Sequence, residues 1–388
     1  MDKIEIIATA TFGLEAVVAD ELKNLGYENL KVENGRVSFA AGMEALCRCN
    51  LWLRTADRVR VKIGEFKAET FDELFEQTKA LPWHDWLPAD AEFPVTGKSV
   101  KSKLFSVSDC QAIVKKAVVE KMKQKYQVSW FEENGPLYPI EVALLNDTAT
   151  LTIDTSGSGL HKRGYRVTGS YAPLKETLAA ALVLLSRWRP DTELIDPLCG
   201  SGTIPIEAAL IGQNIAPGMN REFISEHWPV ITRKDWRNAR KETHDAAHFD
   251  LPLHIRGTDI DEHVLKIARE NSTEAGFEDQ IHFQRMPLAE LSSAKKYGKI
   301  ICNPPYGERL GSMEEITALY REMGQVFTKL DTWSFYILTA YEGFEKLFGK
   351  RASKKRKLYN GDIKVDYYQY FGPRLPRKKE GLPAAGDL

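Results

Sequence analysis

Apolar residues at the start of the chain follow two spacings in turn. Residues 4–10 alternate loosely, as in a strand, and residues 14–25 repeat apolar positions every three or four residues, as in an amphipathic helix. An Asn-Gly dipeptide at 34–35 then separates two short apolar runs, which predicts a hairpin. The pattern therefore predicts a small α+β unit, which we place at residues 1–58.

A second α+β pattern begins near Val59. It predicts helices at 71–79 and 109–126, and strands at 138–145 and 148–153 that close the unit. We place this unit at residues 59–155.

The rest of the chain, residues 156–388, alternates short apolar strands with helices. This alternation is typical of an α/β domain with a mostly parallel, doubly wound sheet. Residues 213–253 interrupt the alternation as an insertion, and a basic run at 350–357 precedes an aromatic strand. The predicted strands are 193–196, 254–259, 280–284, 299–302, 333–338 and 365–372, and the predicted helices are 175–188, 203–211, 262–275 and 314–329.

Charge and composition narrow the function only a little. The 388 residues carry 53 Lys plus Arg against 54 Asp plus Glu, so overall charge gives no attraction to nucleic acid or membrane. The longest apolar run, at 178–185, is too short to cross a bilayer, and the acidic N-terminus does not resemble an export signal. Five cysteines without a CxxC pair predict a reduced, cytoplasmic protein, and the HDAAH segment at 244–248 is a weak metal candidate. We therefore expect neither a membrane partner nor a bound metal.

A local cluster of lysines departs from this neutral balance. Between Lys98 and Lys125 the sequence has eight lysines and two acids, Asp109 and Glu120. Such a cluster can hold the phosphate backbone of a nucleic acid without reading its sequence, although a solvated helix face is an equally good explanation of the pattern alone. The candidate RNA-binding residues in it are Lys98, Lys101, Lys103, Lys115 and Lys116.

The first chemical motif is DPLCGSGT at 196–203, between an apolar strand and a helix. Its glycines allow a tight turn, and the amides that open the helix favour an electronegative ligand group. The motif lacks the GxGxxG and GxxxxGK(S/T) patterns, and an acid followed by proline matches the S-adenosylmethionine loop of Rossmann-like methyltransferases, where the acid addresses the amino acid end of the cofactor. The candidate cofactor-binding residues are Asp196, Pro197, Cys199, Gly200, Gly202 and Thr203.

Two later strand ends add to this cofactor site. Asp259 ends the next strand and is placed to accept hydrogen bonds from a ribose, whereas Asp261 is placed to cap the following helix. After the third strand many methyltransferases have an Asp beside the adenine, but this sequence has Met286 and Pro287. We therefore expect apolar contact from Met286 there.

The second chemical motif is NPPYGERL at 303–310. The amine of a nucleobase is a poor nucleophile because its lone pair is delocalised into the ring. If the Asn303 amide oxygen and the Pro304 carbonyl accept its two protons, the lone pair can attack a methyl group. Tyr306 would stack on an extruded base. The candidate catalytic residues are Asn303, Pro304, Pro305 and Tyr306.

These motifs, with HKRGYR at 161–166 and APLKETLAAALV at 172–183, resemble the THUMP-domain Rossmann-fold RNA methyltransferases. Within that family the sequence is most similar to the RlmL-type bacterial enzymes that methylate guanine N2 in 23S rRNA, in a short form with a single methyltransferase domain. The resemblance covers nearly the whole chain. It implies a ferredoxin-like region, then a THUMP RNA-binding region, then a methyltransferase domain.

The same resemblance implies S-adenosylmethionine as the cofactor and RNA as the partner. It also implies RNA-backbone contacts from Arg163 and Arg166, for which a salt bridge at the domain linker is the alternative. The usual Pro-Cys dipeptide of cytosine C5 methyltransferases is absent, since Cys199 follows Leu198 and Cys302 precedes Asn303. We therefore set aside a cysteine nucleophile.

Three other functions remain open at this point. A tRNA guanine-N2 methyltransferase fits because THUMP regions commonly accompany tRNA recognition. A DNA adenine-N6 methyltransferase would share the NPPY motif, but it would need a target recognition domain, which is not evident after residue 375. A non-catalytic RNA-binding assembly factor would keep the fold without the chemistry.

Overall fold

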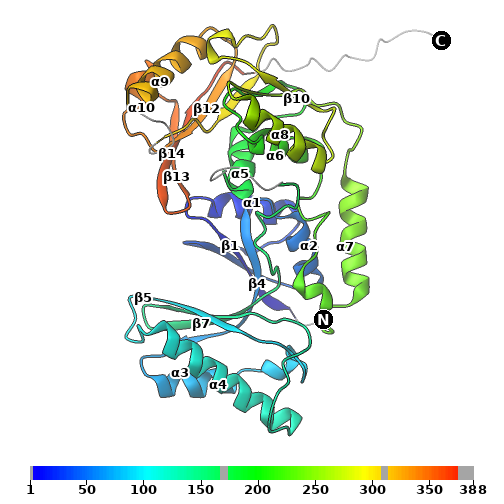
Figure 1. Cartoon of the computed structure of the whole chain (residues 1–388). Helices are drawn as coiled ribbons and strands as arrows, with labels where there is room; N and C mark the ends of the chain where they lie inside the picture. Colours follow the sequence, from blue (N-terminus) through cyan, green and yellow to red (C-terminus); the bar gives the residue numbers. More distant parts are fainter. Residues whose placement is uncertain (1–2, 167–173, 307–312, 375–388) are drawn as a thin grey trace, which may run out of the picture.

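A computed structural model describes residues 3–166, 174–306 and 313–374. Within these ranges the strands form two sheets, one in an N-terminal module and one in a C-terminal module (Figure 1). The α+β and α/β classes expected for the two parts are both present. No helix in the described ranges combines the length and the apolarity that crossing a membrane requires.

The N-terminal sheet joins the two predicted α+β units. Its strand order is β2-β3-β1-β4-β7-β6-β5, antiparallel except for the β5–β6 pair. Asn34 and Gly35 form the predicted turn between β2 and β3. The strands are β1 (Ile4–Ala10), β2 (Lys31–Glu33), β3 (Arg36–Ala41), β4 (Ala56–Lys67), β5 (Val95–Val100), β6 (Ile140–Leu145) and β7 (Thr148–Asp154).

The long strand β4 connects these units directly. Val61 pairs with Ile6 of β1 on one side and with Ile153 of β7 on the other. A boundary between residues 58 and 59 therefore falls inside a single strand. The two regions share one hydrogen-bonded sheet, with a register shift in each of the two ladders of β4.

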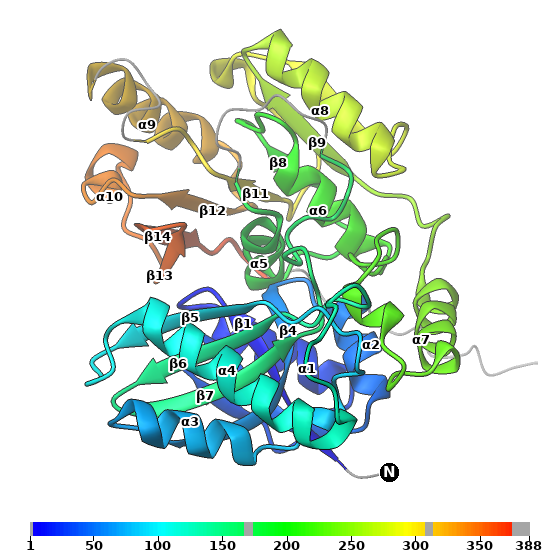
Figure 2. The same ribbon diagram turned by 60° about the horizontal axis from the view of Figure 1, so that its bottom comes forward.

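Helices cover this sheet. Figure 2 shows α3 and α4 lying over the β5–β6–β7 part. Thr70 starts α3 with a capping box, because its hydroxyl accepts from the Glu73 amide and the Glu73 carboxylate accepts from the Thr70 amide. The helices are α1 (Glu15–Asn24), α2 (Glu44–Trp52), α3 (Phe71–Ala80) and α4 (Val107–Tyr126), with a 3₁₀ turn η1 (Trp83–Asp85).

The C-terminal sheet has the strand order β10-β9-β8-β11-β12-β14-β13. Strands β8 to β12 run parallel, and β14 pairs antiparallel with both β12 and β13. The strands are β8 (Leu194–Asp196), β9 (Ile255–Asp259), β10 (Ile281–Arg285), β11 (Lys299–Cys302), β12 (Ser334–Thr339), β13 (Lys354–Asn360) and β14 (Ile363–Tyr370).

Helices pack on both faces of this sheet, as a doubly wound fold requires. Buried residues of α5, α6 and α8 form one apolar cluster, and those of α9 and α10 form another across the sheet. The helices are α5 (Glu176–Ser186), α6 (Thr203–Gly212), α8 (Glu262–Glu274), α9 (Met313–Phe327) and α10 (Phe344–Phe348), with a 3₁₀ turn η3 (Leu288–Glu290).

The insertion at 213–253 crosses back to the N-terminal module. It carries a 3₁₀ turn η2 (Ile224–His227) and α7 (Arg233–Ala246), which lies beside α2. Trp228 stacks on Tyr138 with ring centroids 4.4 Å apart, and Arg48 of α2 forms an ion pair with Glu242 at 2.8 Å. The insertion therefore adds apolar side chains to the N-terminal core and fixes the two modules against each other.

Candidate active site

The carboxyl ends of three adjacent parallel strands bring the sequence motifs together. Strand β8 lies between β9 and β11. Asp196 ends β8, Asp259 ends β9, and Asn303 directly follows β11. Open α/β sheets bind their ligands at this edge. Residues more than 100 positions apart therefore share one edge of the sheet.

Gly200 and Gly202 of the DPLCGSGT loop have different structural roles. Gly200 has a φ of 51° and Gly202 a φ of 80°, so both adopt the left-handed backbone that favours glycine. A Cβ on Gly202 would lie 3.0 Å from a ring carbon of Phe283, whereas a Cβ on Gly200 would enter open space. Gly202 thus permits close packing and begins α6 without a side-chain cap. Gly200 leaves room on the side where a ligand would approach, and the first amides of α6 remain suited to its polar groups.

Asp196 is a buried carboxylate without a cationic partner among the described residues. It accepts a hydrogen bond from the Leu198 amide at 3.2 Å. Burial, and then the nearby charge of Asp259, raise its pKa well above the ordinary value. A ligand that places an ammonium group here would relieve both effects. The amino acid end of S-adenosylmethionine carries such a group, so this residue fits the cofactor.

Asp259 holds the loop in place and still has acceptor capacity. Its carboxylate accepts from the Gly200 amide at 3.0 Å and from the Asp261 amide at 3.1 Å. A carboxylate offers about four lone-pair sites, so it can also accept from ribose hydroxyls. Asp261 caps α8 by accepting from the His263 amide, as predicted. The Met286 amide donates to the Asp259 carbonyl at 3.0 Å, which brings Met286 to the same strand ends.

Ile260 is a residue at this edge that the sequence motifs did not single out. It lies between the two acids and is 63% exposed. An exposed isoleucine at the tip of a buried strand can cover an apolar ligand surface. The only signal in the sequence is a hydrophobic residue enclosed by Asp259 and Asp261.

Asn303 has an unused acceptor. Its amide oxygen Oδ1 is buried, and no described residue donates to it. Leaving such a group unsatisfied costs about 1–3 kcal/mol. The carbonyl of Pro305, two residues after Asn303, accepts from the Tyr320 hydroxyl at 3.2 Å. This hydrogen bond anchors the backbone of the motif. The motif therefore holds a buried amide oxygen without a donor among the described residues, and a ligand N–H that reached this atom would satisfy it.

Tyr306 is placed differently from its predicted role. The residue is only 5% exposed, and its hydroxyl accepts from the side-chain amide nitrogen of Asn360 at 3.0 Å. In this structure the ring packs in the apolar core, so it shows no open face for a base. Base stacking on Tyr306 stays a prediction. Residues 307–310 of the motif lie outside the described ranges.

The cysteines near this edge are unsuited to nucleophilic attack. Burial, reinforced by the charge of Asp196, raises the pKa of both Cys199 and Cys302 well above the ordinary value. A thiolate is the reactive form and is disfavoured at both sites. This agrees with setting aside a covalent cysteine mechanism.

The two arginines of the HKRGYR segment form salt bridges at the junction. Arg163, with 2% of its side chain exposed, pairs with Glu207 of α6 at 3.3 Å and also donates to the Arg54 carbonyl of the N-terminal module. A buried guanidinium cannot reach an RNA backbone, so the predicted RNA contact of Arg163 is replaced by its alternative, the linker salt bridge. Arg166 pairs with Glu176 of α5 at 2.8 Å and donates to the hydroxyl of Thr203, the first residue of α6. It therefore contacts the end of the predicted cofactor loop.

The lysine cluster is less positive than its sequence indicates. Three of the five candidate lysines have partners from other segments, namely Lys98 with Glu141, Lys103 with Glu69, and Lys115 with Glu133. Lys101 and Lys116 are exposed and have no ion pair among the described residues. These two are the candidates that keep a free positive charge.

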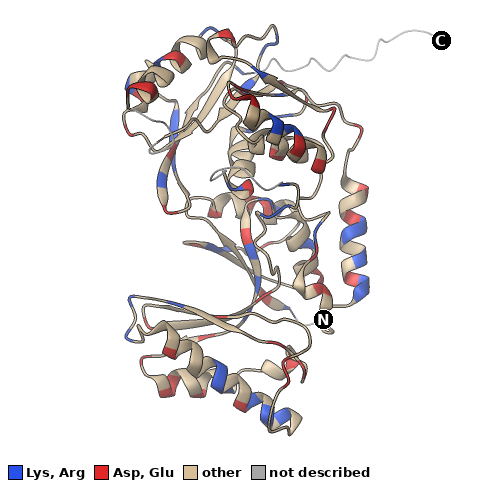
Figure 3. Ribbon diagram, in the orientation of Figure 1, with Lys and Arg blue, Asp and Glu red and all other residues tan. Residues whose placement is uncertain are grey.

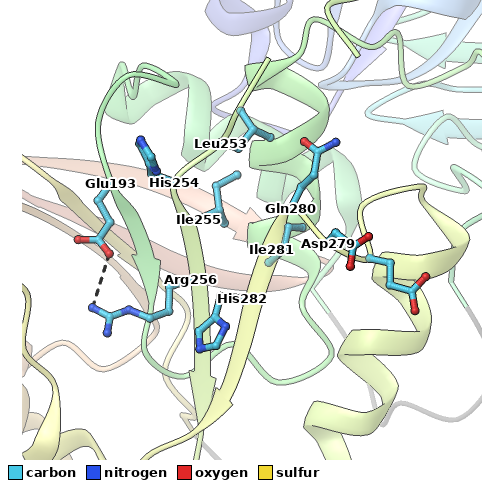
Figure 4. A pocket seen from close by; sticks show the side chains of 10 residues that line it. Glu193, Leu253, His254, Ile255, Arg256, Asp279, Gln280, Ile281 and His282 are labelled. Carbon is cyan, nitrogen blue, oxygen red and sulfur yellow. Dashed lines mark ion pairs between the residues drawn. The ribbon is translucent and has the colours of Figure 1, made fainter. Parts of the chain in front are cut away.

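Other clusters carry none of the predicted chemistry. The pocket in Figure 4 is lined by Glu193, Arg256 and the first residues of β9 and β10, at the edge of the sheet opposite the motifs. His244 is exposed near the end of α7, and His248 lies beyond that helix. No metal-binding group of three His, Cys, Asp or Glu occurs among the described residues.

Comparison with known families agrees with the architecture. Residues 163–369 match the RMKL-like methyltransferase domain, residues 5–60 match the RlmL ferredoxin-like domain, and residues 68–154 match the THUMP domain.

Individual relatives carry different names. The chain is 55% identical over 382 residues to "Putative RNA methyltransferase YpsC" of Bacillus subtilis, covering 98% of this chain and 99% of the relative. It is 36% identical to "Ribosomal RNA large subunit methyltransferase K/L" of Syntrophotalea carbinolica over 96% of this chain, but it spans only 55% of that protein.

Solved structures resemble the whole chain. SMU.472, described as a putative methyltransferase complexed with SAH, has a TM-score of 0.92 and 48% identity, covering 97% of this chain and 100% of that one. A predicted N6-adenine-specific DNA methylase from Listeria monocytogenes has a TM-score of 0.92 and 56% identity, with 96% and 97% covered. From its matched domains and its full-length relatives, the chain belongs to the THUMP-containing, RlmL-like methyltransferase family.

Proposed function

We propose that this protein transfers a methyl group from S-adenosyl-L-methionine to the exocyclic N2 amine of a guanine in RNA, with 23S rRNA as the substrate. The observation that carries the proposal is the buried, unpartnered amide oxygen of Asn303 at the same sheet edge as the open side of Gly200. The SAH complex of a relative with 48% identity supports the cofactor, and the THUMP match supports RNA.

The residues divide the work between binding and activation. Asp196 holds the ammonium group of the cofactor, Asp259 accepts from its ribose, and Met286 and Ile260 cover its adenine. The bound cofactor supplies an electrophilic methyl group. Asn303 Oδ1 and the Pro304 carbonyl would accept hydrogen bonds from the two amine N–H groups, so that the nitrogen lone pair would face that methyl group. Transfer would form the nitrogen–carbon bond as the carbon–sulfur bond breaks, and the methylated amine would lose one proton to solvent. This arrangement needs no covalent intermediate.

Substrate class is decided by a transfer assay. Purified protein and radiolabelled cofactor are incubated with unmodified rRNA, tRNA or duplex DNA, and the labelled nucleoside is identified by mass spectrometry. We expect N2-methylguanosine in 23S rRNA, and no transfer with the Asn303→Ala variant. Transfer confined to DNA contradicts the proposal.

A second candidate is a DNA adenine-N6 methyltransferase. The specific observation that favours it is the name of the Listeria structure, which has 56% identity to this chain. Asn303 would accept from adenine N6 in the same way, so the site does not distinguish these amines. In the same assay this candidate predicts N6-methyladenine in DNA. A tRNA guanine-N2 activity would give N2-methylguanosine in the tRNA sample only.

A further inference from the structure

The β13–β14 hairpin carries a concentration of positive charge that the proposed function does not yet use. From residue 350 to residue 364 the chain has seven basic residues and one acid, Asp362. Figure 3 shows this charge along β13. Lys355 pairs with Asp366, and Lys364 with Glu342. Lys354 and Lys357 are exposed and have no ion pair among the described residues, whereas one guanidinium nitrogen of Arg356 is buried.

The turn of this hairpin lies at the reactive edge of the sheet. Strand β14 runs antiparallel to β12, and its Asp366 pairs with Thr339, the last residue of β12. The turn at 361–362 therefore extends beyond the carboxyl end of β12. Asn360, the last residue of β13, donates to the Tyr306 hydroxyl at 3.0 Å. This hydrogen bond joins the hairpin to the NPPY motif.

An aromatic pair stands beside these charges. Phe12, in the loop between β1 and α1, is 55% exposed and meets Tyr359 of β13 edge to face, with ring centroids 6.3 Å apart. The Lys357 ammonium lies 5.3 Å from the centre of the Tyr359 ring. A Cβ on Gly13 would come within 2.7 Å of the Lys357 carbonyl, so this loop packs directly on β13. The N-terminal module and the hairpin thus form one surface.

We infer that Lys354 and Lys357, which project from opposite faces of the edge strand β13, form with the Phe12–Tyr359 pair a docking edge for a single-stranded RNA segment and deliver its nucleotide to Asn303. This inference rests on the proposed function and specifies how its substrate is held. Free cations that follow an edge strand neutralise phosphates, and neighbouring rings stack on bases, which is the combination that single-stranded nucleic acid requires. The contact with Tyr306 connects this docking edge to the site of transfer.

The test compares two charge reversals of equal size. Lys354→Glu with Lys357→Glu changes the hairpin, and Lys295→Glu with Lys296→Glu changes two exposed lysines before β11, at the opposite edge of the same sheet. Binding of a fluorescein-labelled single-stranded RNA of about 20 nucleotides is measured by anisotropy over a range of salt concentrations. We expect the hairpin double variant to bind about tenfold more weakly, with a salt slope reduced by about 1.4 for two lost phosphate contacts. The control should stay within about twofold.

Phe12→Ala tests the stacking part separately. It should weaken the same RNA by about fivefold or more and leave the salt slope unchanged, because it removes no charge. Cofactor titration and thermal melting are run on every variant and should match the wild type. A hairpin variant that binds RNA like the wild type overturns the inference, and so does an equal loss in the control.

The outcomes separate this inference from the proposed function. If the wild type methylates rRNA while the hairpin variants bind RNA normally, the docking edge is wrong and the proposed function stands. If the wild type methylates DNA alone, the proposed function fails. The docking edge then also fails unless the hairpin variants still lose affinity for the RNA probe.

Discussion

Among the described residues, polar groups are buried and unpaired at the carboxyl edge of the methyltransferase sheet. On the lysine-bearing face of the THUMP region they are exposed, and several are paired. At the sheet edge, Asp196 is buried and has no described cationic partner, and Asn303 has a buried acceptor without a donor. On the THUMP face, Lys98 and Lys103 are exposed and already paired with glutamates. A buried unpaired group strongly favours a ligand that satisfies it, whereas an exposed pair contributes little. Pairing and burial therefore distinguish a binding site from a charged surface.

The largest predicted effect is on the free energy of unfolding, and it concerns a charge that is both buried and paired. Arg163→Ala leaves the buried Glu207 carboxylate without its partner, and we expect it to lower the free energy of unfolding by about 3–5 kcal/mol. Arg163→Met with Glu207→Leu removes both charges and should recover most of that loss. Urea unfolding measures both. Wild-type stability in the single variant would show that the two charges are not coupled.

Asn303→Ala tests the unpaired acceptor. We expect turnover to fall at least about a hundredfold, equivalent to about 3 kcal/mol, because the amine protons lose one of their acceptors. Cofactor affinity should stay within about twofold, and RNA affinity should fall far less than turnover. Single-turnover methyl transfer and titration calorimetry check these values. Asn238→Ala, at an exposed position on α7, is the matched control and should leave all three unchanged.

Asp196→Asn tests the unpaired acid. Losing the charged contact should weaken cofactor binding by about 1.5–3 kcal/mol, measured by calorimetry. Stability should move the other way. Burial raises the Asp196 pKa above its ordinary 3.8. The folded protein is therefore most stable at low pH, where this acid is protonated, and it loses stability as pH rises through the raised pKa, because a buried charge then forms. The Asn variant lacks this loss.

Melting curves from about pH 4 to about pH 8 show the sign. Relative to the wild type without cofactor, the variant should gain stability as pH increases. A constant difference in melting temperature across the range would mean that the acid does not titrate there.

The smallest effect compares free with paired lysines. Lys101→Glu with Lys116→Glu removes free charge and should weaken RNA binding about tenfold, or about 1.4 kcal/mol. Lys98→Glu with Lys103→Glu removes charge that glutamates already offset and should weaken it about threefold or less. Anisotropy at two salt concentrations measures both doubles. Equal losses would mean that the ion pairs open on binding RNA.

The strand-end motifs could be predicted from sequence because their geometry is local. A residue that directly follows a short apolar strand of a parallel sheet must lie at its carboxyl edge, which placed Asp196, Asp259 and Asn303 together before any contact was known. The Asp261 cap followed from the same local rule. Most predicted helices and strands end within a few residues of their observed limits, since periodicity also acts locally.

Partners from distant segments could not be predicted in this way. The charge count over the lysine cluster omitted Glu69, Glu133 and Glu141, which come from other elements. Arg163 met Glu207 only because α6 packs under the linker. The Tyr306 hydroxyl is bound by Asn360, more than fifty residues later, and its ring is buried by the apolar core around it. Each of these contacts is created by tertiary packing, and no window of sequence contains both partners.

Strand β4 has a mechanical consequence. It is hydrogen-bonded to β1 along one side and to β7 along the other, so the ferredoxin-like and THUMP regions cannot swivel about a flexible hinge without opening that ladder. The insertion fastens the same body to the methyltransferase domain through Arg48 and Glu242. These two connections fix the distance between α4 and the predicted site of methyl transfer. An RNA that touches both ends would be selected by its own length and shape.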